Sequence, residues 1–204
     1  MHENISLVIQ AGGNSRRMGE DKALKIFLDR PLIQRVVERL APIAKEILVT
    51  TNHTDDYAFL NLHLFPDLIP DRGALGGLYT AIASASYPIV AVVACDMPFA
   101  SATLLQMAID LLVSEEMDVV IPRSTEGLEP LHAVYRRTTC LPIIRAAINA
   151  NQLKIIDWFP SVRVYELGMN EVAKADPLGL VFRNINTPED FALAERLAQL
   201  RQDR

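Results

Sequence analysis

Cysteine is scarce in this chain, and its scarcity argues against two kinds of stabilising site. The 204 residues include only two cysteines, Cys95 and Cys140, which are far apart and form no Cys-x-x-Cys pair. Neither a cysteine-ligated zinc site nor a disulfide framework is therefore indicated. A reducing compartment is the simpler expectation for such a chain.

Long apolar runs are absent as well. The apolar segments are far shorter than the roughly 20 residues that a membrane-spanning helix needs. The first apolar run follows His2 and Glu3 without a basic segment, so we expect no signal peptide. These features predict a soluble, cytoplasmic protein that makes no membrane contact.

A strongly basic surface is missing too. The formal net charge of -5 argues against a sequence-independent nucleic-acid binder, which needs a basic face. A nucleotide substrate stays compatible with this charge, because one Mg²⁺ and a few well-placed cations neutralise a triphosphate. Half of the residues are apolar, which is the composition of a globular protein.

Strand-length apolar segments alternate with segments of helical periodicity. The segment IVAVVAC at residues 89–95 is apolar on both faces, as expected of a central parallel strand. The alternation predicts a single α/β domain over residues 1–204, a three-layer α/β/α arrangement around a mainly parallel, Rossmann-like sheet. Strands are expected at 5–10, 46–51, 89–95 and 117–121, and helices at 31–40, 75–84, 101–113 and 187–200.

A glycine-rich loop directly follows the first expected strand. Residues 10–22 read QAGGNSRRMGEDK. In open α/β sheets, ligands bind beyond the carboxyl ends of the strands, and glycines there let backbone N–H groups approach phosphate oxygens. Arg16, Arg17 and Lys22 add positive charge that complements a triphosphate. The loop matches neither Walker A nor Gly-x-Gly-x-x-Gly, and a basic surface turn is its structural alternative.

The same loop resembles the signature of a protein family. Its pattern Ala-Gly-Gly-x-Ser-x-Arg-Met-Gly-x-Asp-Lys looks like that of nucleotidyltransferases, and most resembles that of the molybdenum cofactor guanylyltransferases. The doubled glycine Gly12-Gly13 and the Asp21-Lys22 pair favour this branch over the cytidylyltransferases, whereas Gln10 stands where the family usually has leucine. The resemblance covers nearly the whole chain and implies a glycosyltransferase-A-like fold. It also implies nucleotide contacts from Gln10, Ala11, Gly12, Gly13, Lys22, Thr50, Asp67, Gly76 and Asp96.

A second motif, Cys95-Asp96-Met97-Pro98, ends the most apolar strand. It places a carboxylate at the sheet edge where the glycine loop is expected, and a charge after a buried run is costly unless it is paired or bound to metal. One aspartate, together with phosphate oxygens and water, is enough to hold Mg²⁺. The resemblance assigns Asp96 to Mg²⁺, and a turn aspartate before Pro98 is the structural alternative.

Two further segments suggest nucleotide and acceptor contacts. Residues 66–77 form a second glycine-rich loop, where the resemblance places Asp67 and Gly76 at a purine pocket; close packing of a helix is the alternative reason for the glycines. Residues 184–190 read NINTPED and match a family segment in which Asn184 and Asn186 help to hold the acceptor or metal. The physical alternative is that Asn186 and Thr187 only cap the last helix.

Two positions near these motifs carry weaker expectations. Thr50 is the best-aligned position for a nucleotide-contacting asparagine of the family, and Asn52 lies two residues further on. His132 suits a structural role better than that of a general base, because no residue pattern forms a triad with it.

The motifs together predict transfer of GMP from GTP to the terminal phosphate of molybdopterin, with release of pyrophosphate. Lys22 is expected to stabilise charge on the α-phosphate, Arg16 to hold the outgoing phosphates, and Asp96 to bind Mg²⁺. No general base is needed, because a phosphate monoester, with a second pKa near ~6, is already anionic at neutral pH.

Two alternative functions stay open at this point. A transferase of the same fold could be specific for CTP or for a sugar phosphate, and a catalytically inactive relative could be a nucleotide-binding regulatory protein. Comparing the four nucleoside triphosphates as ligands tests the first alternative, and pyrophosphate release tests the second. Transient contact with molybdenum cofactor delivery proteins or target enzymes is a further expectation.

Overall fold

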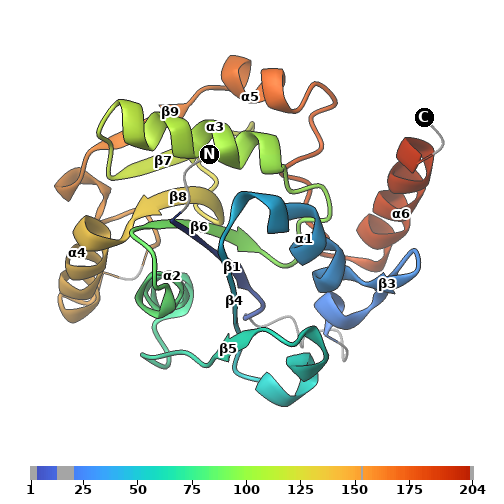
Figure 1. Cartoon of the computed structure of the whole chain (residues 1–204), viewed down its shortest axis with the longest axis horizontal. Coiled ribbons are helices and arrows are strands. Elements are labelled where there is room, and N and C mark those ends of the chain that lie inside the picture. Colours follow the sequence, from blue (N-terminus) through green and yellow to red (C-terminus); the bar gives the residue numbers. More distant parts are fainter. Residues whose placement is uncertain (1–3, 13–20, 153, 203–204) are drawn as a thin grey trace.

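The computed structural model of the chain describes residues 4–12, 21–152 and 154–202 (Figure 1). Gly13 and Arg16, for which nucleotide contacts are predicted, lie outside the described residues. Nine strands are described: β1 (Ile5–Gln10), β2 (Ile26–Phe27), β3 (Arg30–Pro31), β4 (Glu46–Thr50), β5 (His63–Phe65), β6 (Ile89–Ala94), β7 (Val119–Pro122), β8 (His132–Arg136) and β9 (Val164–Leu167). The α-helices of the described chain are α1 (Leu32–Leu40), α2 (Gly73–Ser84), α3 (Ala102–Ser114), α4 (Arg137–Asn149), α5 (Met169–Ala175) and α6 (Pro188–Gln202).

Seven of the strands form one mainly parallel sheet, as the alternation of segments predicts. The strand order is β5-β4-β1-β6-β8-β7-β9. The pairs β1–β4, β1–β6, β4–β5 and β7–β9 are parallel, and β8 runs antiparallel to both of its neighbours. Strands β1 and β6 lie side by side at the centre and are buried along their whole length. That complete burial explains why both read as unbroken apolar runs in the sequence.

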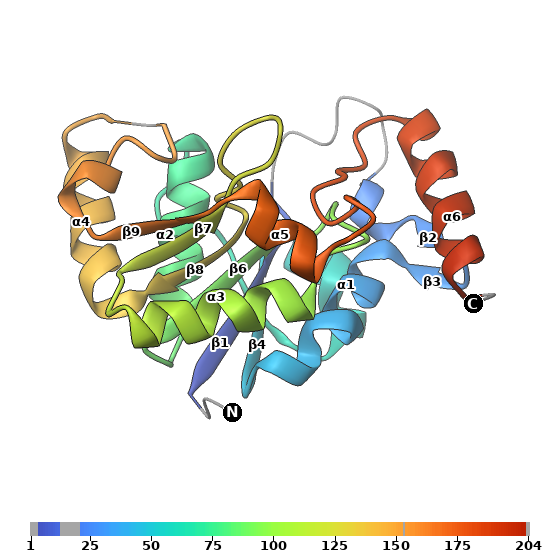
Figure 2. The same ribbon diagram turned by 90° about the horizontal axis from the view of Figure 1, so that it is seen from above.

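Helices cover both faces of this sheet, which confirms the three-layer α/β/α arrangement. Helices α1, α3 and α5 pack on one face, and α2 and α4 pack on the other (Figures 1 and 2). Each face has its own apolar cluster, because alternate residues of the central strands point to opposite sides. Within the described residues, no helix is both long and apolar enough to cross a membrane.

The expected elements are present with small shifts at their ends. Helix α3 begins after Ser101, whose Oγ accepts a hydrogen bond from the Leu104 amide at 3.2 Å, as expected of its cap. Helix α2 begins at Gly73, two residues before the expected start at residue 75, and the Gly76 amide donates to the Arg72 carbonyl at 3.0 Å. Residues 73–77 of the expected glycine-rich loop therefore belong to the helix.

A third apolar cluster lies beyond the sheet and holds the C-terminal helix. The β2–β3 hairpin and α6 meet through Phe27 and Phe191, whose ring centroids are 5.5 Å apart, and the two elements lie together at one side of the molecule (Figure 2). Ile185, which is 1% exposed, belongs to the same cluster. The cluster therefore anchors the segment around Asn184 and Asn186 before α6 begins.

Candidate active site

The carboxyl ends of β1, β4 and β6 meet at one edge of the sheet. Gln10 pairs with Thr50 on one side and with Ala94 on the other. The pairing continues past the strand ends, since the Ala11 amide donates to the Thr50 carbonyl at 2.9 Å and the Cys95 amide donates to the Gln10 carbonyl at 3.0 Å. The start of the glycine loop and the Asp96 motif are therefore neighbours, as the parallel topology predicts.

Lys22 stands at the far end of the glycine loop and is oriented by the residue before it. Asp21 caps the short 3-10 helix η2 (Lys22–Leu24), because its Oδ1 accepts the Ala23 amide at 3.1 Å. Its Oδ2 accepts the hydroxyl of the buried Tyr57 at 2.7 Å. Burial raises the pKa of Tyr57, and the Asp21 carboxylate raises it further, so the hydroxyl stays a donor at neutral pH.

The segment around Asn184 and Asn186 joins Lys22 and Asp96 in space. The Ile185 amide donates to the Asp96 carbonyl at 2.9 Å. The Lys22 ammonium donates to the Asn186 carbonyl. Three motifs that are far apart in the sequence are thereby brought to one place.

The Asp96 carboxylate is a suitable oxygen ligand for a divalent cation. Burial raises the pKa of Asp96, against the lowering effects of a backbone hydrogen bond and of the Lys22 charge. A carboxylate whose charge is disfavoured by burial gains when a cation binds beside it. No group of three or more His, Cys, Asp or Glu side chains in the described chain is arranged to hold a metal ion. A cation at Asp96 would therefore need further ligands from phosphate and water, which is usual for Mg²⁺.

Asp67 on the second loop is held by Asn52, for which the sequence analysis predicted no definite contact. The Asn52 Nδ2 donates to Asp67 Oδ2 at 2.8 Å, and the Asp67 amide donates to Asn52 Oδ1 at 2.9 Å. Thr50, the better-aligned position, is only 3% exposed, and its carbonyl is taken by Ala11. The reciprocal pair fixes the carboxylate of Asp67 beside the end of β4.

The glycines of the two loops differ in what surrounds them. A Cβ at Gly76 would lie 2.6 Å from the Arg72 Cβ, so close packing of α2 alone requires a glycine there. A Cβ at Gly77 would lie 3.1 Å from the side-chain Nε2 of Gln10, so the Gln10 side chain packs against α2 at this glycine. A Cβ at Gly12 would meet none of the described residues within 4 Å. Nucleotide contacts of Gly12 and Gly76 stay predictions.

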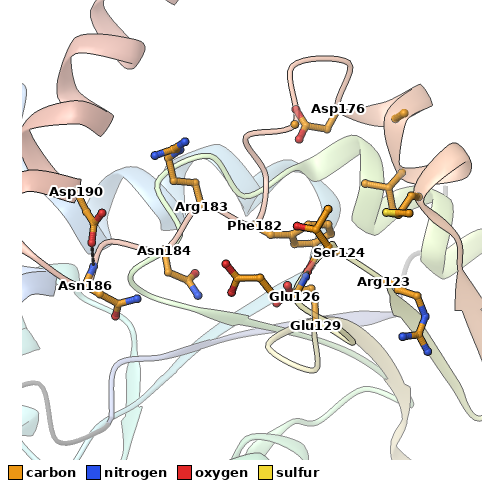
Figure 3. Close-up of a pocket in the computed structure, with 15 residues that line it drawn as sticks. Arg123, Ser124, Glu126, Glu129, Asp176, Phe182, Arg183, Asn184, Asn186 and Asp190 are labelled. Carbon is orange, nitrogen blue, oxygen red and sulfur yellow. Dashed lines mark hydrogen bonds between the residues drawn. The ribbon is translucent and has the colours of Figure 1, made fainter.

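A cavity of about 510 Å³ opens next to the Asn184–Asn186 segment. Its lining includes Asn184 and Asn186, and Figure 3 shows both residues on the side of the cavity near the start of α6. The Oδ1 atom of Asn184 is buried and has no hydrogen-bond partner among the described residues. An unpaired buried acceptor of this kind is costly unless a ligand supplies a donor.

The chain is also similar to known proteins over most of its length. Residues 7–159 match the family described as MobA-like NTP transferase domain. The chain belongs to this family. A probable molybdenum cofactor guanylyltransferase from Pelotomaculum thermopropionicum is 35% identical over 192 residues, which are 94% of this chain and 92% of that protein. The molybdenum cofactor guanylyltransferase of Desulfosudis oleivorans is 33% identical, with 94% of each chain covered.

Solved structures share the MobA-like fold. Molybdopterin-guanine dinucleotide biosynthesis protein A from Archaeoglobus fulgidus has a TM-score of 0.81 at 24% identity and covers 95% of this chain and 98% of its own. The 4-diphosphocytidyl-2C-methyl-D-erythritol synthase of Anaerococcus prevotii has a TM-score of 0.69 at 12% identity, with 97% and 96% covered. Because proteins named for guanine and for cytidyl compounds share the architecture, the fold by itself does not select the nucleotide.

Asn186 and Thr187 lie just before α6, where the sequence left capping of that helix as the alternative role. Thr187 caps α6 by accepting the Asp190 amide on its Oγ1 at 3.1 Å, and Asp190 accepts the Thr187 amide at 2.9 Å in return. Asn186 takes part in this cap only through its backbone amide, so its side chain is left for the cavity. Capping of α6 therefore does not explain why the side chain at position 186 is an asparagine.

His132 has a structural place in β8. It is fully buried, and its Nε2 accepts the Ser101 amide at the start of α3 at 3.1 Å. Its Nδ1 has no hydrogen-bond partner among the described residues. Burial lowers the pKa of His132 to about 4, so the side chain is neutral at physiological pH.

This burial makes a prediction about acid stability. In the unfolded chain His132 regains an ordinary pKa near 6.5, so between pH 6.5 and about 4 the unfolded state binds a proton that the folded state excludes. Stability should then fall as the pH falls, by about 1.4 kcal/mol per pH unit from this group. Urea unfolding from pH 7.5 to 4.5 should show a shallower acid loss in His132→Gln than in the wild type. Parallel curves would contradict the burial argument.

Proposed function

We propose that the chain transfers GMP from GTP to the terminal phosphate of molybdopterin and releases pyrophosphate. The observation that carries this proposal is the contact between the Lys22 ammonium and the Asn186 carbonyl. It brings the nucleotide end of the site against the cavity that would receive the acceptor. The names of the relatives that are about one third identical support the same reaction over the CTP, sugar-phosphate and regulatory alternatives.

The chemistry asks the protein to position two substrates and to stabilise charge. An oxygen of the acceptor phosphate attacks the α-phosphorus, and the bond from that phosphorus to the oxygen bridging the α- and β-phosphates breaks. The electron pair leaves with pyrophosphate. Lys22 would stabilise the charge that develops on the α-phosphate, and Arg16 is proposed to hold the outgoing phosphates.

Asp96 would hold Mg²⁺ together with oxygens of the triphosphate. A cation held there would supply positive charge that offsets the charge of the phosphates. The bond from the Ile185 amide to the Asp96 carbonyl supports this arrangement, because it ties the proposed metal ligand to the acceptor segment. The attacking phosphate is anionic at neutral pH, so no side chain has to remove a proton from it.

Asp67 is proposed to select guanine among the bases. Guanine carries two adjacent donors, N1–H and the 2-amino group, and a carboxylate accepts both, as it does not from cytosine, adenine or uracil. Asn52 keeps the carboxylate in one orientation, which supports such a reading. The location in the cytoplasm and contact with delivery proteins or target enzymes stay predictions.

Calorimetric titration with the four nucleoside triphosphates in Mg²⁺ tests the nucleotide assignment. The wild type is expected to bind GTP most tightly. Asp67→Asn and Asn52→Ala should weaken GTP by about 10- to 100-fold, the usual loss for a bidentate base contact, and should change ATP, CTP and UTP much less. Asn149→Ala, an exposed position at the end of α4, is the matched control. Tightest binding of CTP would move the chain to the cytidylyltransferase alternative.

A further inference from the structure

Three of the six charged residues that line the 510 Å³ cavity already have side-chain partners in the protein. Asp176 accepts the Val181 amide at 2.7 Å, and Asp190 belongs to the cap of α6. Arg123 pairs with Glu166 at 2.6 Å. The other three, Glu126, Glu129 and Arg183, make no ion pair with a described residue. Glu126 is exposed, whereas Glu129 is half-buried. The Arg183 guanidinium makes no hydrogen bond within the described chain, and its charge acts on the Asp190 carboxylate.

Glu129 lies on the side of the cavity away from α6, with both polar and apolar residues around it (Figure 3). Its backbone is fixed, because its amide donates to the Pro122 carbonyl at 2.9 Å. The cavity wall beside it includes Phe182, whose ring packs edge-on against His132 with centroids 5.7 Å apart, and Val172 of α5. Burial raises the pKa of Glu129, a hydrogen bond from the Ser124 side chain lowers it, and the negative charge of Glu126 raises it. A half-buried carboxylate without a cation gains from a ligand that donates hydrogen bonds.

The opposite side of the cavity suits an anion. Arg183, Asn184 and Asn186 lie on the side toward the start of α6, and Asn186 is the residue that the Lys22 ammonium touches (Figure 3). A phosphate bound there would lie near Lys22 and Asp96, where the transfer has to occur. An elongated acceptor that places its phosphate at this side must place its other end toward Glu129.

We propose that Glu129 accepts hydrogen bonds from the ring end of the acceptor, a pterin, while Arg183 receives the acceptor phosphate. A pterin carries N3–H and a 2-amino group side by side, and the two oxygens of a carboxylate match this pair. Phe182 and Val172 supply the apolar wall for the flat ring. The inference rests on the proposed function and adds the orientation of the acceptor in the cavity, with its phosphate at Arg183 and its ring at Glu129. It also makes Glu129 a specificity-determining residue.

The same chemistry then serves both substrates. Guanine and pterin share the donor pair of a 2-amino-4-oxopyrimidine ring, and each would meet one carboxylate: Asp67 for the nucleotide and Glu129 for the acceptor. The two carboxylates are held by different residues. Asn52 orients Asp67 through two hydrogen bonds, whereas the Ser124 side chain donates a hydrogen bond to Glu129.

The test uses fluorescence titration of the full chain with 6-hydroxymethylpterin and with 6-hydroxymethyllumazine, in which oxygen replaces the 2-amino group. The wild type should prefer the pterin by about 10- to 100-fold. Glu129→Gln should lose that preference, because its amide offers one acceptor and one donor. Glu115→Gln, an exposed change at the end of α3, should behave as the wild type. Equal binding of the two ligands by the wild type, no binding of either, or a loss carried by Glu126→Gln on the cavity rim would each overturn the proposal.

Two further measurements separate this proposal from the function on which it rests. Glu129→Gln should bind GTP as the wild type does and should raise the KM for molybdopterin at least about tenfold in pyrophosphate release. Wild-type turnover combined with an unchanged KM in Glu129→Gln would refute the pterin contact and leave the guanylyltransferase function intact. Absence of molybdopterin-dependent pyrophosphate release in the wild type would refute the function itself.

Discussion

Lys22→Ala is expected to lower the turnover of GTP by about 10²- to 10³-fold, which is the usual loss when one charge-stabilising donor is removed from a transition state. Lys22 is suited to this role by position. Its ammonium reaches across to the Asn186 carbonyl, so it lies at the junction between the proposed nucleotide and acceptor sites. Initial rates of pyrophosphate release at saturating GTP measure the effect directly.

The fold should survive this substitution. Lys22 begins a short 3-10 helix whose cap is the neighbouring Asp21, and both Asp21 contacts remain when the Lys22 side chain is removed. Thermal unfolding of Lys22→Ala should therefore match that of the wild type. Lys45→Ala is the control for loss of one positive charge, since Lys45 precedes β4 at the opposite edge of the sheet. A wild-type rate in Lys22→Ala would remove Lys22 from the mechanism.

The part of the fold that could be predicted from the sequence is the part with the strongest burial. Strands β1 and β6 are buried on both faces, so a polar side chain is unfavourable at nearly every position in them. Strand β5 has only three residues, and β9 is partly exposed, so neither leaves a clear apolar signal. Helix α4 contains Pro142, which usually argues against a continuous helix.

The candidate site shows the same division. Lys22, Asp96, Asn184 and Asn186 were predicted from motifs, and the structure brings their segments together. The supporting contacts were not predicted, because they join residues without any motif of their own. Tyr57 bonds to Asp21, which lies 36 residues earlier in the sequence. Tyr57 belongs to a short 3-10 helix (Thr54–Leu60), and the local sequence of that helix does not predict the contact.

Asn52 and Glu129 show how little signal such residues leave. Asn52 lies two positions beyond the strand residue that aligned best, and only the fold reveals that it holds Asp67. Glu129 lies just before β8, at the start of a segment that resembles a family strand on the acceptor side, but that resemblance assigned it no role. Its placement in the cavity depends on α5 and on residues 176–184, which line the same cavity and lie far from Glu129 in the sequence. Such side chains can be recognised by their burial and missing partners in the folded chain, and not by spacing.

Asp96→Asn is expected to lower Mg²⁺-dependent pyrophosphate release by roughly 10³-fold or more, because the proposed metal site would lose the carboxylate that we assign to it. Asparagine keeps the shape of the side chain and removes its charge. A titration of activity with Mg²⁺ should show that added metal does not restore the rate. Asp157→Asn, at an exposed position far along the sequence, controls for the loss of one negative charge.

The stability of the same variant separates a metal ligand from a structural aspartate. Burial raises the pKa of Asp96 above its ordinary value of 3.8, because the folded chain disfavours the charged carboxylate. The free energy of unfolding therefore falls as the pH rises from 3.8 through the raised pKa. At neutral pH without metal, Asp96→Asn should therefore unfold at the same temperature as the wild type or at a higher one. Added Mg²⁺ and GTP should stabilise the wild type more than the variant, because only the intact site gains the ligand. A lower unfolding temperature without metal, together with unchanged Mg²⁺ dependence of the rate, would make Asp96 a structural turn residue and would leave the proposed metal site without a ligand from this chain.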